Sequence, residues 1–247
     1  MNETTLPQSL IEKLRFANRV VVLTGAGISA ESRIPTFRDA LTGLWAKYKP
    51  EELATPEAFI SNPKLVWDWY QWRCSLVSHA SPNPGHNALV QMEKHVPHFT
   101  LVTQNVDSLH ARAGNNHVLE LHGNISRTRC FQENTIVTSW KEDGQSPPRC
   151  PSCGGMLRPD VVWFGESLPQ DVLEQAAKAS AACDVFFSIG TSAVVFPAAS
   201  LVYEAMRNRA VTVEINPTPT AQAGELSYAL QGPAGEILPA LIEETWG

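Results

Sequence analysis

Four short, nearly continuous apolar runs recur along the chain and are separated by much longer segments. Runs of this length are typical of strands that are buried on both faces inside a parallel sheet. Each run is followed directly by small or polar residues, which indicates that the strand ends there. The predicted strands are Val20–Leu23, Phe99–Val102, Val185–Ile189 and Val211–Ile215.

Apolar positions spaced three or four residues apart predict helices between these strands. Strands that alternate with helices indicate an α/β fold with a Rossmann-like, doubly wound parallel sheet. Ligands of such sheets bind beyond the carboxyl ends of the strands, so we expect the polar residues at the four strand ends to line one crevice. The predicted helices carry Leu10, Leu14 and Ala17, then Val172, Ala176 and Ala179, and a third spans Ala198–Arg209.

Two segments interrupt the alternation, one rich in Pro and Trp and one rich in turns around Cys150-Pro151-Ser152-Cys153. We expect them to pack together as a smaller, inserted lobe that is part helical and part zinc knuckle. The chain is then a single domain, 1–247. Its large lobe comprises about 6–46, 97–125 and 160–247, and its small lobe about 47–95 and 126–159.

Composition excludes several classes of protein. The chain has 247 residues, a net charge of −6 and 18% charged residues, so no basic surface for nucleic acid is indicated. It has no apolar run near the roughly 18 residues that a membrane helix needs, and no basic, apolar leader. Five cysteines, an odd number, favour a metal site or free thiols over a disulfide framework. We expect a cytoplasmic protein with neither membrane nor nucleic-acid partners.

The segment Gly25–Ser32 follows the first predicted strand and contains a Gly-x-Gly-x-x-Ala pattern. A turn from strand to helix presents backbone N–H groups to an anion such as a diphosphate. Gly25 and Gly27 permit a tight turn and close approach of a ligand, and Ala30 stands at the position of a third glycine that keeps the helix near the sheet. The pattern alone is weak, because any such turn favours small residues.

Further motifs follow this turn in a fixed order and extend over nearly the whole chain. Together they are far more specific than any one of them. With them, the chain resembles the sirtuin family, the NAD-dependent protein deacylases. The matching segments are Gly25–Ser32, Ile34–Arg38, Thr103–His110, Glu120–Gly123, Arg158–Glu166, Gly190–Ser192 and Asn216–Pro217.

The resemblance implies an enzyme that transfers an acyl group from protein lysine to NAD, releasing nicotinamide and O-acyl-ADP-ribose. Its partners would be proteins that carry acylated lysine. Two alternatives stay open. One is NAD hydrolysis or ADP-ribosyl transfer at the same site, and the other is a non-catalytic NAD-sensing module.

Three polar residues are the candidate catalytic groups. His122 in Glu-Leu-His-Gly is the candidate general base, because an imidazole titrates near neutral pH and can take a proton from a ribose hydroxyl. Asn105 and Asp107 supply an amide and a carboxylate that can orient a carboxamide and a ribose hydroxyl. Taken alone, this pair would be interpreted as capping a turn, because Asn and Asp favour turns. The resemblance implies that both, with Gln104, bind the nicotinamide and ribose side of NAD.

The resemblance also implies which residues contact NAD. A loop after Pro35 is expected to close over the cofactor and exclude water. Beside it, Arg33 stands where the family usually has glycine, which is unfavourable if that position needs a positive φ. The implied contacts are Gly25, Ala26, Gly27, Ser29, Ala30, Thr36, Phe37, Arg38, Trp45, Gln104, Asn105, Val106, Asp107, Gly190, Thr191, Ser192, Asn216 and Ala234.

Tyr70 and Arg73 form a Tyr-x-x-Arg pattern, and residues three apart lie on one face of a helix. A guanidinium beside a phenol can bind a carboxylate. The pattern is similar to that of class III sirtuins, which implies that succinyl and malonyl groups are preferred to acetyl. The alternative is a packed aromatic helix with Arg73 on the surface, and Trp67, Trp69 and Trp72 are assigned to packing. The implied substrate contacts also include Val162, Phe164 and Gly165.

Sirtuins generally hold zinc with two Cys-x-x-Cys pairs, but only the second pair is intact here. Cys130 is followed three positions later by Glu133 instead of a second cysteine. Zinc on Cys130, Cys150 and Cys153, with Glu133, a histidine or nothing as fourth ligand, is one hypothesis. A metal-free knuckle is the other. Cys74 and Cys183 are expected to be small buried apolar residues.

Overall fold

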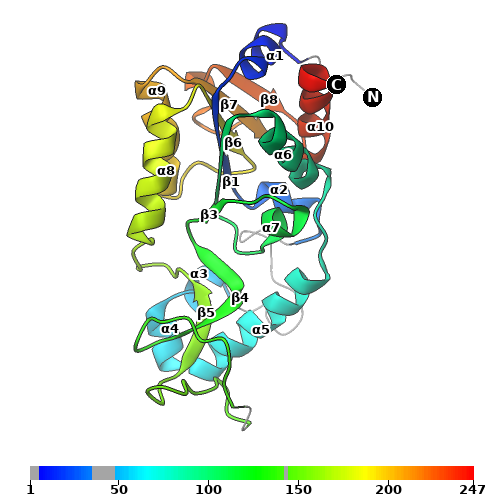
Figure 1. Cartoon of the computed structure of the whole chain (residues 1–247). Coiled ribbons are helices and arrows are strands. Elements are labelled where there is room, and N and C mark those ends of the chain that lie inside the picture. Colours follow the sequence, from blue (N-terminus) through cyan, green and yellow to red (C-terminus); the bar gives the residue numbers. More distant parts are fainter. Residues whose placement is uncertain (1–5, 35–47, 142–143) are drawn as a thin grey trace.

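A six-stranded sheet, parallel throughout, forms the centre of the large lobe in the computed structural model, which describes residues 6–34, 48–141 and 144–247 (Figure 1). Its strand order is β3-β2-β1-β6-β7-β8. The order reverses between β1 and β6, and a crevice for ligands is expected at such a reversal. The strands are β1 Arg19–Thr24, β2 His98–Thr103, β3 Val118–Glu120, β6 Val185–Ile189, β7 Val211–Asn216 and β8 Tyr228–Gln231.

The predicted parallel sheet is confirmed, and its four predicted strands are the central ones, β2, β1, β6 and β7. The two edge strands, β3 and β8, were missed. They contain only three and four residues, and their side chains are mostly half-buried or exposed. A short strand with one solvated side lacks the continuous apolar run that marks a buried strand.

Helices cover both faces of this sheet, so an apolar core lies on each face. Successive residues of β1 belong alternately to the two cores. Val20 and Val22 belong to one apolar core, and Val21 and Leu23 belong to the other. Because successive strand residues point to opposite faces, a strand between two cores is apolar at every position. One face carries α1 Gln8–Arg15, α6 Pro84–His95 and α10 Ala234–Trp246, and the other carries α8 Gln170–Ala182, the 3-10 turn η2 Ala198–Ser200 and α9 Leu201–Arg207 (Figure 1).

Helix α6 differs from the expected division into lobes. Its sequence lies within 47–95, which was assigned to the small lobe, yet Ala88, Leu89 and Met92 pack in the core beneath the large sheet. The predicted helix Ala198–Arg209 is also divided, into η2 and α9, and it ends at Arg207. The prediction grouped α6 with the Trp-rich segment that precedes it, on the basis of composition. In the structure, the buried apolar face of α6 packs against α10 of the large lobe.

The smaller lobe joins helices to a two-stranded antiparallel sheet, β4 Gly123–Cys130 and β5 Leu157–Val161. Aromatic rings fill its core, and the centroids of Phe59 and Trp163 lie 5.3 Å apart. The antiparallel pair was not predicted, because Arg127, Arg129 and Pro159 interrupt any strand-like alternation. The described helices of this lobe are α3 Pro50–Leu53, α4 Pro56–Ser61 and α5 Pro63–His79. Other short elements in the described ranges are α2 Gly27–Ala30, α7 Leu109–Ala113 and η3 Ala223–Glu225.

Three helices begin with the same local signal, a Thr or Asn side chain followed by proline. Thr55 accepts a hydrogen bond from the Ala58 N–H at 3.1 Å, and Asn62 accepts one from the Leu65 N–H at 3.2 Å. Asn83 caps α6 in a reciprocal capping box. Proline at the first helical position has no N–H to leave unpaired, so each start is fixed locally. Within the described ranges, no helix is both long enough and apolar enough to span a membrane.

Candidate active site

Three loops meet at the carboxyl end of the sheet because the ladder of backbone hydrogen bonds continues past the strands. Gly25 N–H donates to Ile189 O at 2.9 Å, and Gln104 N–H donates to Thr24 O at 2.9 Å. Gly190 N–H donates to Ile215 O at 3.0 Å. The loops after β1, β2 and β6 therefore lie side by side, as expected for residues that line one crevice.

The glycine turn packs directly against the loop after β6. A Cβ on Gly25 would lie 2.8 Å from Gly190 O, and a Cβ on Gly27 would lie 2.6 Å from Gly190 Cα. Gly27 N–H also donates to Gly190 O at 2.7 Å, so this N–H group is not free for an anion. The glycines allow two loops to touch. Ala30 is exposed at the end of the single-turn helix α2, and the close approach expected there is made by Gly27 instead.

The loop after β6 is pinned by side chains on both sides. The Thr191 hydroxyl accepts a hydrogen bond from Gln104 Nε2 at 3.1 Å, and Thr191 O accepts one from Asn216 Nδ2 at 3.0 Å. Ala193 N–H donates to the same hydroxyl at 3.2 Å. The structure therefore joins Gln104, Thr191 and Asn216, three of the predicted NAD contacts, into one hydrogen-bonded group.

Asn105, Asp107 and Ser29 form a second group beside the glycine turn. Asn105 Nδ2 donates to Gly25 O and to Ser29 Oγ, each at 3.1 Å, and Ser29 Oγ donates to Asp107 Oδ2 at 2.7 Å. Both amide hydrogens of Asn105 are thus used within the protein, which leaves Oδ1 as its acceptor for a ligand. Asp107 also accepts the Leu109 N–H at 2.9 Å, so it caps α7 as well. Burial raises the pKa of Asp107, although the Leu109 and Ser29 donors oppose this shift.

His122 lies at the junction of the two lobes, on the turn between β3 and β4. Its Nδ1 is 2.8 Å from Gln104 O, and since a carbonyl can only accept, Nδ1 carries the proton. Nε2 then holds the free lone pair of the neutral ring. Burial lowers the pKa of His122, and the hydrogen bond to Gln104 only partly opposes this. The imidazole is therefore a neutral base at pH 7.

Several predicted NAD contacts are placed differently or lie outside the described residues. Thr36, Phe37, Arg38 and Trp45 all fall in the undescribed 35–47. Arg33, just before that range, has φ 62°, so the unfavourable positive φ anticipated there does occur. Ala234 is buried at the first turn of α10, where Glu31 accepts the neighbouring Gly235 N–H at 2.8 Å.

Tyr70 and Arg73 both lie on α5, in the smaller lobe. Tyr70 is only 2% exposed, and its hydroxyl accepts a hydrogen bond from Trp163 Nε1 at 2.9 Å. Burial raises the pKa of Tyr70, so the phenol keeps its proton. Arg73 is half-buried with its guanidinium 5.4 Å from the Trp69 ring, so it is not the surface cation of the alternative interpretation. Burial lowers the pKa of Arg73, yet a guanidinium remains charged at neutral pH.

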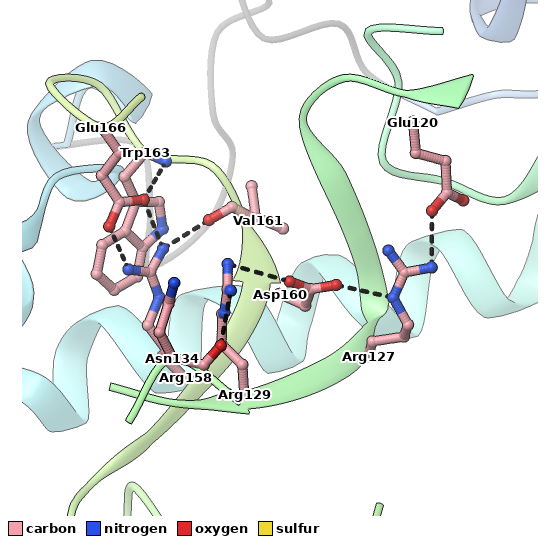
Figure 2. A network of polar contacts seen from close by, with 9 residues as sticks. All are labelled: Glu120, Arg127, Arg129, Asn134, Arg158, Asp160, Val161, Trp163 and Glu166. Atoms are coloured by element: carbon pink, nitrogen blue, oxygen red, sulfur yellow. Dashed lines mark hydrogen bonds and ion pairs between the residues drawn. The ribbon is translucent and has the colours of Figure 1, made fainter. Parts of the chain in front are cut away.

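The segment after β5, which includes the predicted substrate contacts Val162, Phe164 and Gly165, is supported from below by Arg158 (Figure 2). The Arg158 guanidinium lies 3.3 Å from the centroid of the Trp163 ring and forms a two-point ion pair with Glu166. Burial alone would raise the pKa of Glu166, but Arg158 and the Trp163 N–H hold it below its ordinary value. Phe164, which follows Trp163 in this segment, is 48% exposed.

A second charged group in Figure 2 joins the two sheets and was not predicted. Arg127 on β4 contacts Glu120 of β3 and Asp160 of β5, each at 2.7 Å. Arg129 lies 3.3 Å from the other oxygen of Asp160. These side chains border a cavity of about 240 Å³. Ion pairs between residues so distant in sequence leave no local signal, so sequence reasoning could not find them.

The four candidate metal ligands gather as the sequence suggested. The ligand atoms of Cys130, Glu133, Cys150 and Cys153 all lie within 4.8 Å of one another. The Sγ atoms of Cys130 and Cys153 are 3.5 Å apart, and Cys150 Sγ is 3.9 Å from Glu133 Oε2. Tetrahedral zinc with ordinary bond lengths needs separations of roughly 3.5–3.8 Å, so three thiolates and one carboxylate fit the ion. Glu133 would supply the fourth ligand.

The other two cysteines match their predicted roles in part. Cys183 is buried, whereas Cys74 is half-buried and donates to Ile125 O at 3.1 Å. All five cysteines of the chain lie in described ranges, and none is in a disulfide. Trp67 and Trp69 are buried in the smaller lobe, as the packing interpretation requires, and Trp72 is half-buried.

The fold and the site together define an enzyme with a nucleotide crevice at the strand ends and a neutral histidine beside it. Comparison with known proteins is consistent with this. Residues 25–197 match the model of the Sir2 family. The chain is also similar to NAD-dependent protein deacylase 1 of Pseudomonas aeruginosa, with 47% identity over an alignment length of 247, which covers 97% of this chain and 99% of that protein. The chain therefore belongs to the Sir2 family.

Solved structures agree over nearly the whole length. A Sir2 homologue in complex with NAD has a TM-score of 0.91 and 43% identity, covering 98% of this chain and 94% of that one. A Sir2 structure with a p53 peptide and NAD+ has a TM-score of 0.86 and 29% identity, covering 97% and 98%. Both lobes thus have counterparts in related structures.

Proposed function

We propose that this Sir2-family enzyme is an NAD-dependent protein deacylase that removes succinyl and malonyl groups from lysine in preference to acetyl groups. Membership of the family and the similarity to curated deacylases support the first part. One observation carries the second part, the acidic acyl preference. Tyr70 and Arg73 lie close together on one face of α5, and the protonated Tyr70 hydroxyl can donate a hydrogen bond.

The Tyr70 hydroxyl is the more constrained member of the pair. Trp163 Nε1 donates to its oxygen, and Trp163 is its only hydrogen-bond partner among the described residues. Because burial keeps the phenol protonated, its O–H is available to donate to a bound acceptor. A carboxylate is the strongest such acceptor, and the nearby guanidinium of Arg73 supplies the matching charge. An acetyl group offers neither partner a charge.

The crevice supplies the other half of the reaction. NAD, when bound, provides the ribose carbon that the acyl oxygen attacks, with nicotinamide as leaving group. Asn105 Oδ1 would accept a hydrogen bond from the carboxamide, and the neutral His122 Nε2 would take a proton from a ribose hydroxyl. Asp107, which accepts hydrogen bonds from Ser29 and Leu109, would orient the ribose.

A protein substrate would bind along two loop segments, one of which adjoins His122, since Val162 N–H donates to His122 O at 2.9 Å. The backbone of Val162–Gly165 and of Ser192–Phe196 can pair with an extended peptide as an added strand, which tolerates many sequences. Val194, Val195 and Phe196 are exposed apolar side chains, with Phe196 at 67%. The related structure with a bound peptide supports a protein partner.

A panel of peptides bearing succinyl-, malonyl- or acetyl-lysine tests the proposal, with free lysine and O-acyl-ADP-ribose measured by mass spectrometry. The wild type should show a higher kcat/KM for the acidic groups. Arg73→Met should lower desuccinylation by roughly 30- to 100-fold, the value of a charge-assisted hydrogen bond, and hardly change deacetylation. Tyr70→Phe should act in the same direction by about tenfold.

Lys64→Met is the matched control, because it removes an exposed cation from the same helix. Equal losses of both activities in Arg73→Met would refute the acyl preference. Full nicotinamide release without any acyl peptide would favour an NAD hydrolase instead. An unchanged biological output in His122→Tyr would favour an NAD sensor.

A further inference from the structure

Two buried histidines, His86 on α6 and His110 on α7, lie side by side behind the crevice. Their side chains are 0% and 2% exposed, and their ring centroids are 4.8 Å apart. One nitrogen of each ring, His86 Nε2 and His110 Nδ1, is buried without a hydrogen-bond partner in the described part of the chain. Unpaired buried polar atoms are rare and unfavourable, so two on adjacent rings need an explanation.

The partners of the other nitrogens determine which ring atoms carry protons. Asn83 N–H donates to His86 Nδ1 at 3.3 Å, so the proton of a neutral His86 is on Nε2. The Thr24 hydroxyl donates to Thr103 Oγ1 at 2.8 Å, which commits its proton. His110 Nε2, 2.9 Å from Thr24 Oγ1, must then be the donor, and His110 Nδ1 keeps a lone pair. The two unpaired atoms are therefore one donor and one acceptor.

We propose that one water bridges His86 Nε2–H and His110 Nδ1, and that the two neutral rings act as a relay that positions Asn105. The relay runs from Asn83 through both rings to Thr24 and Thr103. It ends at Thr103 Oγ1, which accepts the Asn105 N–H at 3.0 Å. His86 and His110 are thus positioning residues, since neither touches the reacting atoms.

Two features support this assignment. Burial lowers the pKa of His86 to about 4 and that of His110 to about 3, so both rings are neutral at pH 7. Asn83, at the other end of the relay, also donates through Nδ2 to Ile28 O at 2.7 Å and to Ser32 Oγ at 3.0 Å. The relay thereby connects the glycine turn and Asn105, the two sides of the crevice, through the interior.

Nitrogen-15 NMR of the histidine rings tests the assignment independently of catalysis. At pH 7 both rings should be neutral with the proton on Nε2, and spectra of His86→Gln and His110→Gln assign the signals. A proton on Nδ1 of either ring, or a doubly protonated ring, would overturn the relay.

Kinetics test the positioning role, whose expected effect on NAD rests on the proposed function. Thr24→Val keeps the side-chain shape but removes the hydroxyl between His110 and Thr103, and Thr24→Ser restores it. Thr24→Val and His110→Leu should each raise KM for NAD about tenfold, the value of roughly one hydrogen bond, with KM for the acyl peptide unchanged. Thr24→Ser should stay near the wild type.

His95→Leu is the control, because His95 ends the same helix as His86 but stacks on Trp246 at the surface. A folded Thr24→Val protein with wild-type KM for NAD refutes the relay, even if His110→Leu does not fold. If the wild type cleaves no acyl peptide, the proposed function fails, whereas the ring tautomers and the calorimetric Kd for NAD still test the relay.

Discussion

The crevice at the sheet edge and the support of the acyl pocket are held in contrasting ways. In the crevice, backbone N–H groups donate hydrogen bonds to carbonyls of the neighbouring strand ends. Uncharged side chains such as Asn105 and Ser29 add further hydrogen bonds there. In the smaller lobe, Arg158 stacks on Trp163 and pairs with Glu166, while Trp163 holds Tyr70. The backbone geometry of the sheet thus positions the crevice, whereas contacts between individual side chains position the support of the acyl pocket. Substitutions should therefore affect chemistry in one and folding or substrate choice in the other.

The largest effect is expected in the crevice, from His122→Ala. Loss of a general base costs about 10²- to 10⁴-fold in rate, so kcat should fall by about a thousandfold with KM for NAD little changed. His117→Ala, an exposed histidine nearby in sequence, is the control. A kcat within tenfold of the wild type would exclude His122 as the base.

The same residue predicts the pH dependence of the wild type. The base acts only when deprotonated, and burial places the pKa of His122 below its ordinary 6.5. If His122 alone limits the rate, kcat should be constant from pH 7 upward and should decline only below pH 6.5. A loss of kcat on acidification with its midpoint above pH 7 would contradict the assignment of His122 as the base.

In the smaller lobe, Arg158→Met should chiefly destabilise the fold. Arg158 is buried but Glu166 is 27% exposed, so leaving Glu166 unpaired should cost about 1–3 kcal/mol, less than in a fully buried pair. Chemical denaturation measures this directly. Arg207→Met breaks an exposed pair with Glu204 and should change stability by less than about 1 kcal/mol. Equal effects of the two variants would show that the support in Figure 2 is not stabilising.

Metal removal tests the other part of the smaller lobe. Protein purified without chelator should contain zinc, and free zinc at about 100 times its Kd should stabilise the fold by about 2.7 kcal/mol. Glu133→Cys should bind zinc more tightly, and Glu133→Ala more weakly. Cys74→Ser, away from the cluster, should retain the metal. Protein without metal by elemental analysis would support the metal-free knuckle.

The smallest effect is expected from the loop contact in the crevice. Gly27→Ala places a Cβ 2.6 Å from Gly190 Cα, and such overpacking costs about 1–3 kcal/mol. NAD affinity should fall with it, because both loops border the crevice. Gly224→Ala adds a Cβ with nothing described within 4 Å and serves as the control. Unchanged NAD affinity in Gly27→Ala would separate the loop contact from cofactor binding.

The same contrast explains what the sequence could predict. Strands β1 and β6 are buried on both faces, so their apolar runs were evident, and parallel topology then brought Gly25, Asn105 and Thr191 together. The contact between Gly27 and Gly190 was not predicted, because the two glycines are distant in the sequence. Strands β4 and β5 were missed because their charged residues pair with each other and with Glu120. Pairings of that kind are properties of the folded chain alone.

The alternation of β1 residues between the two cores couples the unfolding of the two helix layers. Because Val20 and Val22 anchor one core, and Val21 and Leu23 the other, neither layer of helices can detach without exposing half of this strand. The two layers should therefore melt as one cooperative unit. The amide of Val22 should exchange with deuterium only through global unfolding, at the free energy of the whole domain, whereas the short edge strand β8 exchanges through local fraying.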